Sequence, residues 1–198
     1  MRSFVVLSLL AAVGFHGNMR ADVIISAPSV TALPGSSGDF DILVTNTGTS
    51  AVPVGAFTFD ISTASSTVDF TGASTITTAA EYIFAGNSFD AINGFPLATR
   101  TRQELTASDV PENAGQDILN AGISRSLGKV FYTIAPSATF TEVDIVFSRN
   151  GTSISDEYGN PVPATTVHGQ IALAPEPRQT AIVLACLGVL ILFGMRER

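Results

Sequence analysis

Three stretches of the chain alternate apolar and polar residues with a period of two, which is the pattern of a half-buried β-strand. The apolar residues that share a face are Phe40, Ile42 and Val44 in the first stretch, Phe57, Phe59 and Ile61 in the second, and Val143, Ile145 and Phe147 in the third. In the first stretch the opposite face carries Asp39, Asp41, Leu43 and Thr45. Each stretch therefore predicts a strand with one face in a core.

Shorter apolar stretches add four candidate strands, over Val23–Ile25, Val68–Phe70, Lys129–Ile134 and Val167–Leu173. Turn-forming clusters rich in Gly, Pro, Asn and Ser separate them. About eight strands without alternating helices predict an all-β fold, an antiparallel β-sandwich of the immunoglobulin-like, jelly-roll kind, over residues 22–174. The least regular region is 71–127, where Thr106–Gly115 reads as a long loop and Thr101–Leu105 as one helical turn.

The first 21 residues have the layout of a secretory signal peptide. Arg2 supplies the positive charge, an apolar stretch follows over 4–15, and small Ala21 precedes Asp22. We expect the Sec machinery to export the chain, with cleavage between Ala21 and Asp22; cleavage after Gly17 and a buried N-terminal helix are the alternatives.

The last 24 residues combine three features. Pro175, Glu176 and Pro177 come first, an uncharged and largely apolar run covers 180–195, and Arg196 and Arg198 end the chain. Sixteen residues make a helix of roughly 24 Å, marginally enough for a hydrocarbon core of about 30 Å. We expect a transmembrane helix with a cytoplasmic arginine-containing tail; a buried core helix is the alternative, although the run has no polar face.

This order of features resembles the PEP-CTERM sorting signal. In that family the tail holds an exported protein at the inner membrane until a membrane peptidase, exosortase, recognises the Pro-Glu-Pro motif and removes the anchor. The resemblance covers 175–198 and implies that Pro175, Glu176, Pro177, Arg196 and Arg198 form the signal. It also implies a protein that is anchored transiently and then moves to the cell surface or extracellular matrix.

The body has its own, coarser resemblance, carried by the order of its strands. The stretches "GDFDILVTN" (38–46), "GKVFYTI" (128–134) and "DEYGN" (156–160) resemble those of cohesin-like and carbohydrate-binding-module-like sandwiches of extracellular bacterial proteins. Such a resemblance implies a fold, and function has to be argued from the residues.

Composition narrows the classes of function. The net charge is -7, and removal of a leader containing Arg2 and Arg20 makes it -9. Nucleic acid is therefore not an expected partner, since binding it requires a basic face. The single cysteine, Cys186, lies in the C-terminal apolar run, so the body has no disulfide and no thiolate chemistry.

Candidate chemistry is sparse. Ser88 is the nearest imitation of a nucleophile elbow but lacks the flanking glycines. His168, the one histidine after the leader, is expected to be structural, on a strand whose residue Val167 is expected in the core. Asp156, Glu157 and Asn160 are candidate calcium ligands, with a plain turn as the alternative, and no other cofactor is expected. Aromatic residues that could stack on a sugar are few, because there is no Trp and only Tyr82, Tyr132 and Tyr158.

The sequence thus predicts an exported, non-catalytic surface or matrix protein, structural or adhesive, whose partners are exosortase, the Sec machinery, the membrane, and polysaccharide or other envelope proteins. The alternative is a carbohydrate-binding module or an extracellular hydrolase on the same scaffold.

Overall fold

The structure, a computed structural model, describes residues 22–89 and 98–174. All regular secondary structure in these residues is β-strand. One sheet has five strands in the order β13 (Ala164–Val167), β1 (Val23–Ser26), β3 (Ser37–Asn46), β10 (Ser124–Ile134) and β6 (Val68–Ser74). A second sheet has seven: β2 (Ser29–Ala32), β14 (Gly169–Leu173), β11 (Glu142–Phe147), β5 (Ala56–Ser62), β8 (Glu104–Asp109) and β7 (Ala98–Arg100), with β12 (Ser153–Ser155) also paired to β5. A small ribbon joins β4 (Val52–Pro53) to β9 (Ile118–Leu119).

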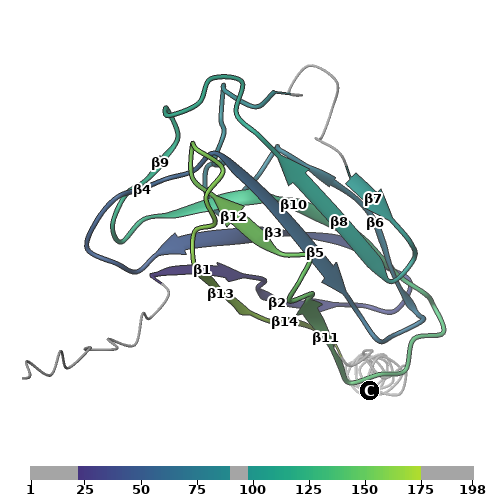
Figure 1. Cartoon of the computed structure of the whole chain (residues 1–198). Coiled ribbons are helices and arrows are strands. Elements are labelled where there is room, and N and C mark those ends of the chain that lie inside the picture. Colours follow the sequence, from purple (N-terminus) through teal and green to yellow (C-terminus); the bar gives the residue numbers. More distant parts are fainter. Residues whose placement is uncertain (1–21, 90–97, 175–198) are drawn as a thin grey trace, which may run out of the picture.

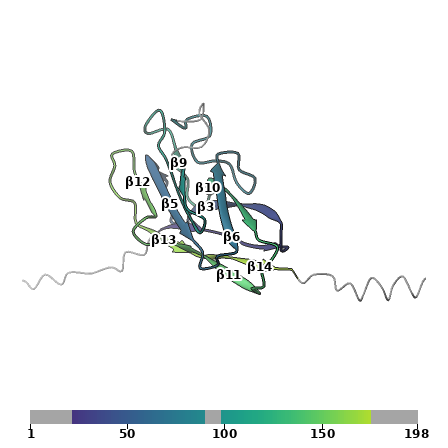
Figure 2. The same cartoon turned by 90° about the vertical axis from the view of Figure 1, so that its right-hand side faces the viewer.

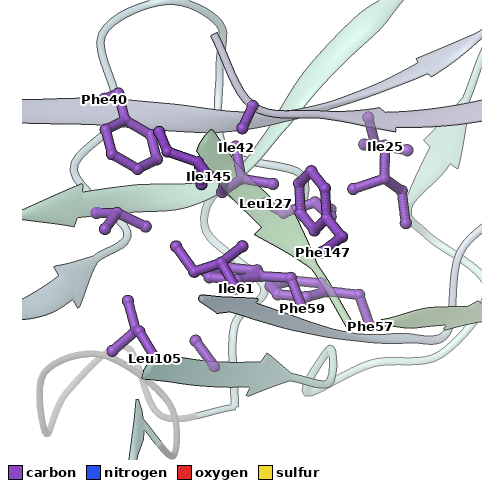
Figure 3. Packing of buried hydrophobic residues seen from close by; sticks show 14 of the residues in the cluster. Ile25, Phe40, Ile42, Phe57, Phe59, Ile61, Leu105, Leu127, Ile145 and Phe147 are labelled. Carbon is purple, nitrogen blue, oxygen red and sulfur yellow. The ribbon is translucent and has the colours of Figure 1, made fainter. Parts of the chain in front are cut away.

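The two larger sheets face each other and enclose the core (Figures 1 and 2). Figure 2 shows β5 and β12 on one side of the sandwich and β3 and β10 on the other. In Figure 3, Phe59 and Ile61 of β5 point toward Ile42 of β3, and all three side chains are completely buried. The predicted inward faces of 40–44 and 57–61 are confirmed, and so is the all-β sandwich.

The first and last strands pair in parallel, which the expected antiparallel pattern did not include. β1 pairs with β13 and β2 pairs with β14, so two chain segments cross together from one sheet to the other. They cross at Ala27 and His168, where the Ala27 amide donates to the Val167 carbonyl (3.1 Å). A Cβ at Gly169 would collide with the Pro28 carbonyl, so only glycine allows the two backbones to approach this closely. The shared crossing links the two sheets on this side of the sandwich, where β13 and β2 are the end strands.

Three local predictions are wrong. Thr106–Asp109 belongs to β8 and is not loop, because Leu105, Ala107 and Asp109 alternate into the core. Thr101–Gln103 forms the turn between β7 and β8, and the residues after it are strand, not helix. The single strand expected over 167–173 is broken at His168, which leaves Val167 half exposed instead of in the core.

The predicted leader, 1–21, and the predicted sorting signal, 175–198, lie outside the described residues. Ala21, Pro175, Glu176, Pro177, Arg196 and Arg198 therefore keep their roles as predictions. Asp22 is described: it is exposed, and its carbonyl accepts hydrogen bonds from the Thr47 amide (2.7 Å) and hydroxyl (2.9 Å). Within 22–89 and 98–174, no helix has the length and apolarity that a membrane crossing requires.

Candidate functional site

The outer face of the five-stranded sheet combines exposed apolar side chains with a few charges. Its position follows from strand periodicity, because the inward residues of β3 are Phe40, Ile42 and Val44, and their neighbours must point outward. Register places the outward residues of β10 and β1 beside those of β3: Phe131 is paired with Asp39, and Ile24 with Thr45.

Four apolar residues, one from each of four strands, lie on this face. Phe131 of β10 is 38% exposed, Val167 of β13 is 50% exposed, and Leu43 of β3 and Ile24 of β1 are half-buried. The opposite neighbour of Phe131 on β6 is Gly72, which has no side chain to cover the ring. Ile24, Leu43 and Val167 lie toward one end of the face, because Leu43 and Val167 both pair with Ser26. Phe131 lies farther along the sheet, beside Asp39, four positions before Leu43 on β3. We call these four residues the apolar patch. Exposed aromatic and aliphatic side chains with few charges among them are typical of the centre of a protein–protein interface.

Charged residues lie next to Phe131. The Lys129 ammonium is 3.1 Å from Asp39 Oδ1, and the lysine side chain is 10% exposed whereas that of Asp39 is 46% exposed. Arg100 Nη1 lies 3.6 Å from Asp69 Oδ1 at the edge strand β6. In the first pair the Asp39 carboxylate is the more exposed group, and in the second the Arg100 guanidinium is, so the patch has a charged border of both signs.

Residues 75–80, which we call the crossing loop, lie over the middle of the same face. Asp41 Oδ2 accepts hydrogen bonds from the amides of Thr78 (2.6 Å) and Ala79 (2.5 Å), so β3 holds the loop although the loop begins at the end of β6. The other Asp41 oxygen is buried and has no partner among the described residues. Ile76, at the outside of the loop, is 78% exposed and adds an apolar side chain above the sheet.

The outer face of the seven-stranded sheet is different in chemistry. The outward residues of β5 and β8 are Thr58, Asp60, Ser62, Glu104, Thr106 and Ser108. Thr106 donates to Asp60 (3.1 Å), and on the neighbouring strands Gln170 donates to Asp144 (3.0 Å). Val146 of β11 is the one exposed large apolar side chain on the described part of this face. The face is polar and acidic, and two pairs of its polar side chains are hydrogen-bonded.

Ser88, the nearest imitation of a nucleophile, is part of a buried hydrogen-bond cluster. Its hydroxyl donates to Asp109 Oδ2 (2.6 Å), and the Tyr82 hydroxyl donates to the same oxygen (2.5 Å). Burial and the Asp109 carboxylate raise the pKa of Tyr82, so the phenol stays a donor. These bonds tie residues 82–88 to the end of β8, and they account for Ser88 without catalysis.

His168 is the only histidine in the described part of the chain. It lies at the crossing between β13 and β14, whereas Ser88 is bound to the end of β8. Its Nδ1 accepts a hydrogen bond from the Phe147 amide (3.0 Å), and its ring stacks on the Phe147 ring with centroids 6.2 Å apart. This is a structural position, as the sequence predicted, and no serine–histidine pair forms in the described residues.

Asp156, Glu157 and Asn160 lie together in the turn between β12 and β13. Asp156 Oδ1 accepts from the amides of Tyr158 (2.9 Å) and Asn160 (2.8 Å), and Oδ2 accepts from the Asn160 side chain (3.0 Å). The hydrogen bond from the Asn160 side chain is the first cause of a lowered pKa for Asp156. This geometry is that of an Asx turn, in which the carboxylate already serves the backbone. The plain turn, the alternative drawn from the sequence, accounts for these contacts, and none of them tests calcium binding.

The tyrosines do not form a platform on which a sugar could stack. Tyr82 and Tyr132 are buried, and only Tyr158 is exposed, at 80%. Sequence reasoning also missed the residues of the apolar patch, and it assigned Val167 to the core. The one available signal was Leu43, an apolar residue among the outward positions of β3.

Comparison with known proteins identifies the fold. No protein-family model and no curated protein matches the sequence. CaCohA2 of Clostridium acetobutylicum, solved in complex with CaDoc0917, superposes with a TM-score of 0.62 at 16% identity, covering 77% of this chain and 99% of that one. The sixth cohesin of Acetivibrio cellulolyticus scaffoldin B, in complex with the Cel5 dockerin, gives 0.60 at 14% identity, with 77% and 99% covered.

A third similar structure is the non-cellulosomal cohesin of the hyperthermophilic archaeon Archaeoglobus fulgidus, with a TM-score of 0.56 at 16% identity, covering 81% of this chain and 97% of that one. The body of the protein is therefore a cohesin-like β-sandwich. At these identities the similarity establishes the fold alone.

Proposed function

We propose that the protein is an exported, non-catalytic binding module whose cohesin-like body holds another envelope or matrix protein, in a structural or adhesive role. The observation that carries this proposal is the apolar patch, Ile24, Leu43, Phe131 and Val167, on one outer face of a sandwich whose other face is polar. A protein partner gains free energy by burying such residues, about 25 cal/mol per Å² of apolar surface.

Two features of the face support a protein as the occupant. Phe131 is an aromatic anchor with a charged border beside it, which is the arrangement of an interface centre and rim. Two of the similar structures were solved as complexes with another protein, CaCohA2 with CaDoc0917 and the scaffoldin B cohesin with the Cel5 dockerin. We propose that this chain also binds a protein, and the proposal does not identify that protein as a dockerin.

Delivery of this module rests on the two ends of the sequence. The leader would send the chain through the inner membrane, and the segment over 175–198 would anchor it until exosortase removes the anchor. The free body would then reach the cell surface or extracellular matrix, where it would bind another envelope or matrix protein.

Site-specific photo-crosslinking in the producing cells tests the binding proposal. A photoreactive phenylalanine analogue at position 131 should form a crosslink to one major protein, which mass spectrometry then identifies. The same analogue at position 146, which is equally exposed on the seven-stranded sheet, is the matched control. Equal crosslinking from both positions, or none from position 131, would contradict the proposal.

Mass spectrometry of the extracellular form tests the delivery. We expect a chain that begins at Asp22 and ends near the Pro-Glu-Pro motif. A soluble extracellular product that retains Arg198 would rule out removal of the anchor.

A further inference from the structure

One end of the sandwich surrounds the point where the body ends. The last described residues are tied into the fold, because the Leu173 amide donates to the Thr141 carbonyl (2.9 Å) and the Ala174 amide donates to the Ala32 carbonyl (2.8 Å). Pro175 follows directly in the sequence. The tied part of the sheet therefore ends five residues before the segment predicted to enter the membrane.

Four turns meet at this end, which we call the exit end: residues 33–36, 63–67, 101–103 and 135–141. Backbone hydrogen bonds join them, from Ile134 to Ser36 (2.9 Å), from Ala135 to Thr67 (2.8 Å) and from Thr63 to Gln103 (3.0 Å). β11 and β14 also reach this end, at the lower right of Figure 1, whereas β4 and β9 lie at the upper left.

The four turns of the exit end are almost uncharged and combine Ser and Thr with a few apolar residues. Arg102 is the only charged residue in its four turns. Leu33 is 48% exposed, and two open recesses of about 550 and 530 Å³ lie on either side of Ala174, with Leu33 and Tyr132 lining one and Pro136 and Phe140 lining the other. In a chain of net charge -7, four turns with no carboxylate of their own are a local exception, and the nearest carboxylates are Asp39, which lines the first recess, and Glu142, which follows the last turn.

The opposite end of the sandwich is acidic. Its turns over 110–117 and 156–163 contain Glu112, Asp117, Asp156 and Glu157 and no lysine or arginine. The two turns are neighbours, since the Val54 amide donates to the Asp117 carbonyl (2.9 Å) while Gly55 donates to that of Ser155 (2.8 Å). The body is thus polarised along its length, with the acidic end farthest from the exit.

The length of the connecting chain limits how far the body can stand from a membrane. Only five residues, 175–179, separate Ala174 from the predicted membrane helix over 180–195. Five extended residues reach roughly 17 Å at most, and the headgroup layer on each side of the hydrocarbon core is itself about 5 to 7 Å thick. While the anchor is present, the exit end has to lie within about 12 Å of the headgroups.

We infer that the exit end rests on the lipid surface in the anchored precursor and orients the body with its acidic end outward. The inference rests on the proposed membrane anchor and adds the contact that the body itself makes. Leu33 and Phe140 contribute apolar area to the interface, Arg102 meets lipid phosphates, and the acidic end is repelled by anionic lipids. The predicted anchor keeps the exit end close to the lipid surface, so even a weak contact with lipid is enough to orient the body.

A single tryptophan can report this contact because the chain contains none. The full chain with Leu33→Trp is reconstituted into vesicles of phosphatidylcholine and phosphatidylglycerol. We expect its emission to shift to shorter wavelength and to be quenched when brominated lipids replace the ordinary ones. The matched control is Tyr158→Trp, an exposed aromatic position in the acidic end, which should show neither change. Ser137→Trp, on a second turn of the exit end, guards against misfolding of the Leu33 variant and should behave like it.

The outcomes separate this inference from the anchor on which it rests. A chain that does not float with the vesicles would overturn both. A chain that floats while Leu33→Trp and Ser137→Trp resemble Tyr158→Trp would leave the anchor intact and overturn the lipid contact. A shift to shorter wavelength without quenching by brominated lipids would also overturn it, since Leu33→Trp would then be covered by protein and not by lipid.

Discussion

Phe131 and Val146 lie on opposite outer faces of the sandwich, and each is 38% exposed. Leu43, Ile24 and Val167 lie on the same face as Phe131, farther along the sheet, and Gly72, opposite Phe131 on β6, leaves its ring uncovered. Around Val146 are serine, threonine and carboxylate side chains, several of them hydrogen-bonded to one another. Exposure of a single apolar residue is ordinary on any protein surface. Because the two residues are equally exposed, their surroundings, and not their exposure, indicate where a partner binds.

The largest expected difference between the faces is in affinity for the partner. We expect Phe131→Ala to weaken binding about 30-fold, the effect of losing a central aromatic anchor worth about 2 kcal/mol. Val146→Ala should change the affinity less than twofold by the same reasoning, since near-neutral positions surround such anchors (roughly 0.4 kcal/mol or less). Calorimetric titration with the crosslinked partner measures both, and equal losses would remove the distinction between the faces.

A smaller difference should appear in stability. Asp41→Ala removes the acceptor that holds the crossing loop over the five-stranded sheet, and we expect a loss of about 1 to 3 kcal/mol in the free energy of unfolding. Asp41→Asn keeps an acceptor oxygen and should lose less. Thr106→Ala on the other face removes a partly exposed hydrogen bond to Asp60 and should cost about 0.5 kcal/mol or less. Urea denaturation gives these values; an Asp41→Ala loss no greater than that of Thr106→Ala would show that the loop is not held by this carboxylate.

Asp117 lies at the acidic end, outside both faces, and should affect stability but not binding. Burial is the main cause of its raised pKa, partly offset by the hydrogen bond from Asn87 and reinforced by Asp109. The folded state therefore holds this proton more tightly than the unfolded state, so stability should fall as pH rises from the ordinary value of 3.8 through the raised pKa. Asp117→Asn should remove that part of the decline in a pH series of thermal melts. A decline of unchanged size in the variant, or a changed affinity for the partner, would contradict this assignment.

The smallest expected effect is that of calcium. Because the oxygens of Asp156 already accept three hydrogen bonds within the turn, we expect millimolar calcium and a chelator to leave the melting temperature unchanged. A rise with calcium that disappears in Asp156→Ala would instead identify the turn as a metal site.

The sequence predicted the core strands because their apolar residues recur every second position, as in 40–44 and 57–61. β8 was missed because its inward positions include small Ala107 and charged Asp109. Asp109 can be buried only because Tyr82 and Ser88, more than 20 residues away, donate to it. Local pattern contains no trace of such distant partners.

The binding face was harder to predict than the core. Leu43 stood out as apolar among outward positions, but Val167 looked like a core residue because nothing in its neighbourhood marks the change of sheet at His168. That change depends on parallel pairing between the first and last strands. Similarly, the exposure of Phe131 depends on its register with Gly72, which is set by an irregularity in the pairing of β10 with β6.

Hydroxyl-radical footprinting of the body with and without its crosslinked partner tests the binding face most directly. The account predicts that the partner protects Phe131, Leu43 and Val167 from oxidation while Val146 reacts as in the free protein. Protection of Val146 with continued oxidation of Phe131 would place the partner on the seven-stranded sheet and contradict the account.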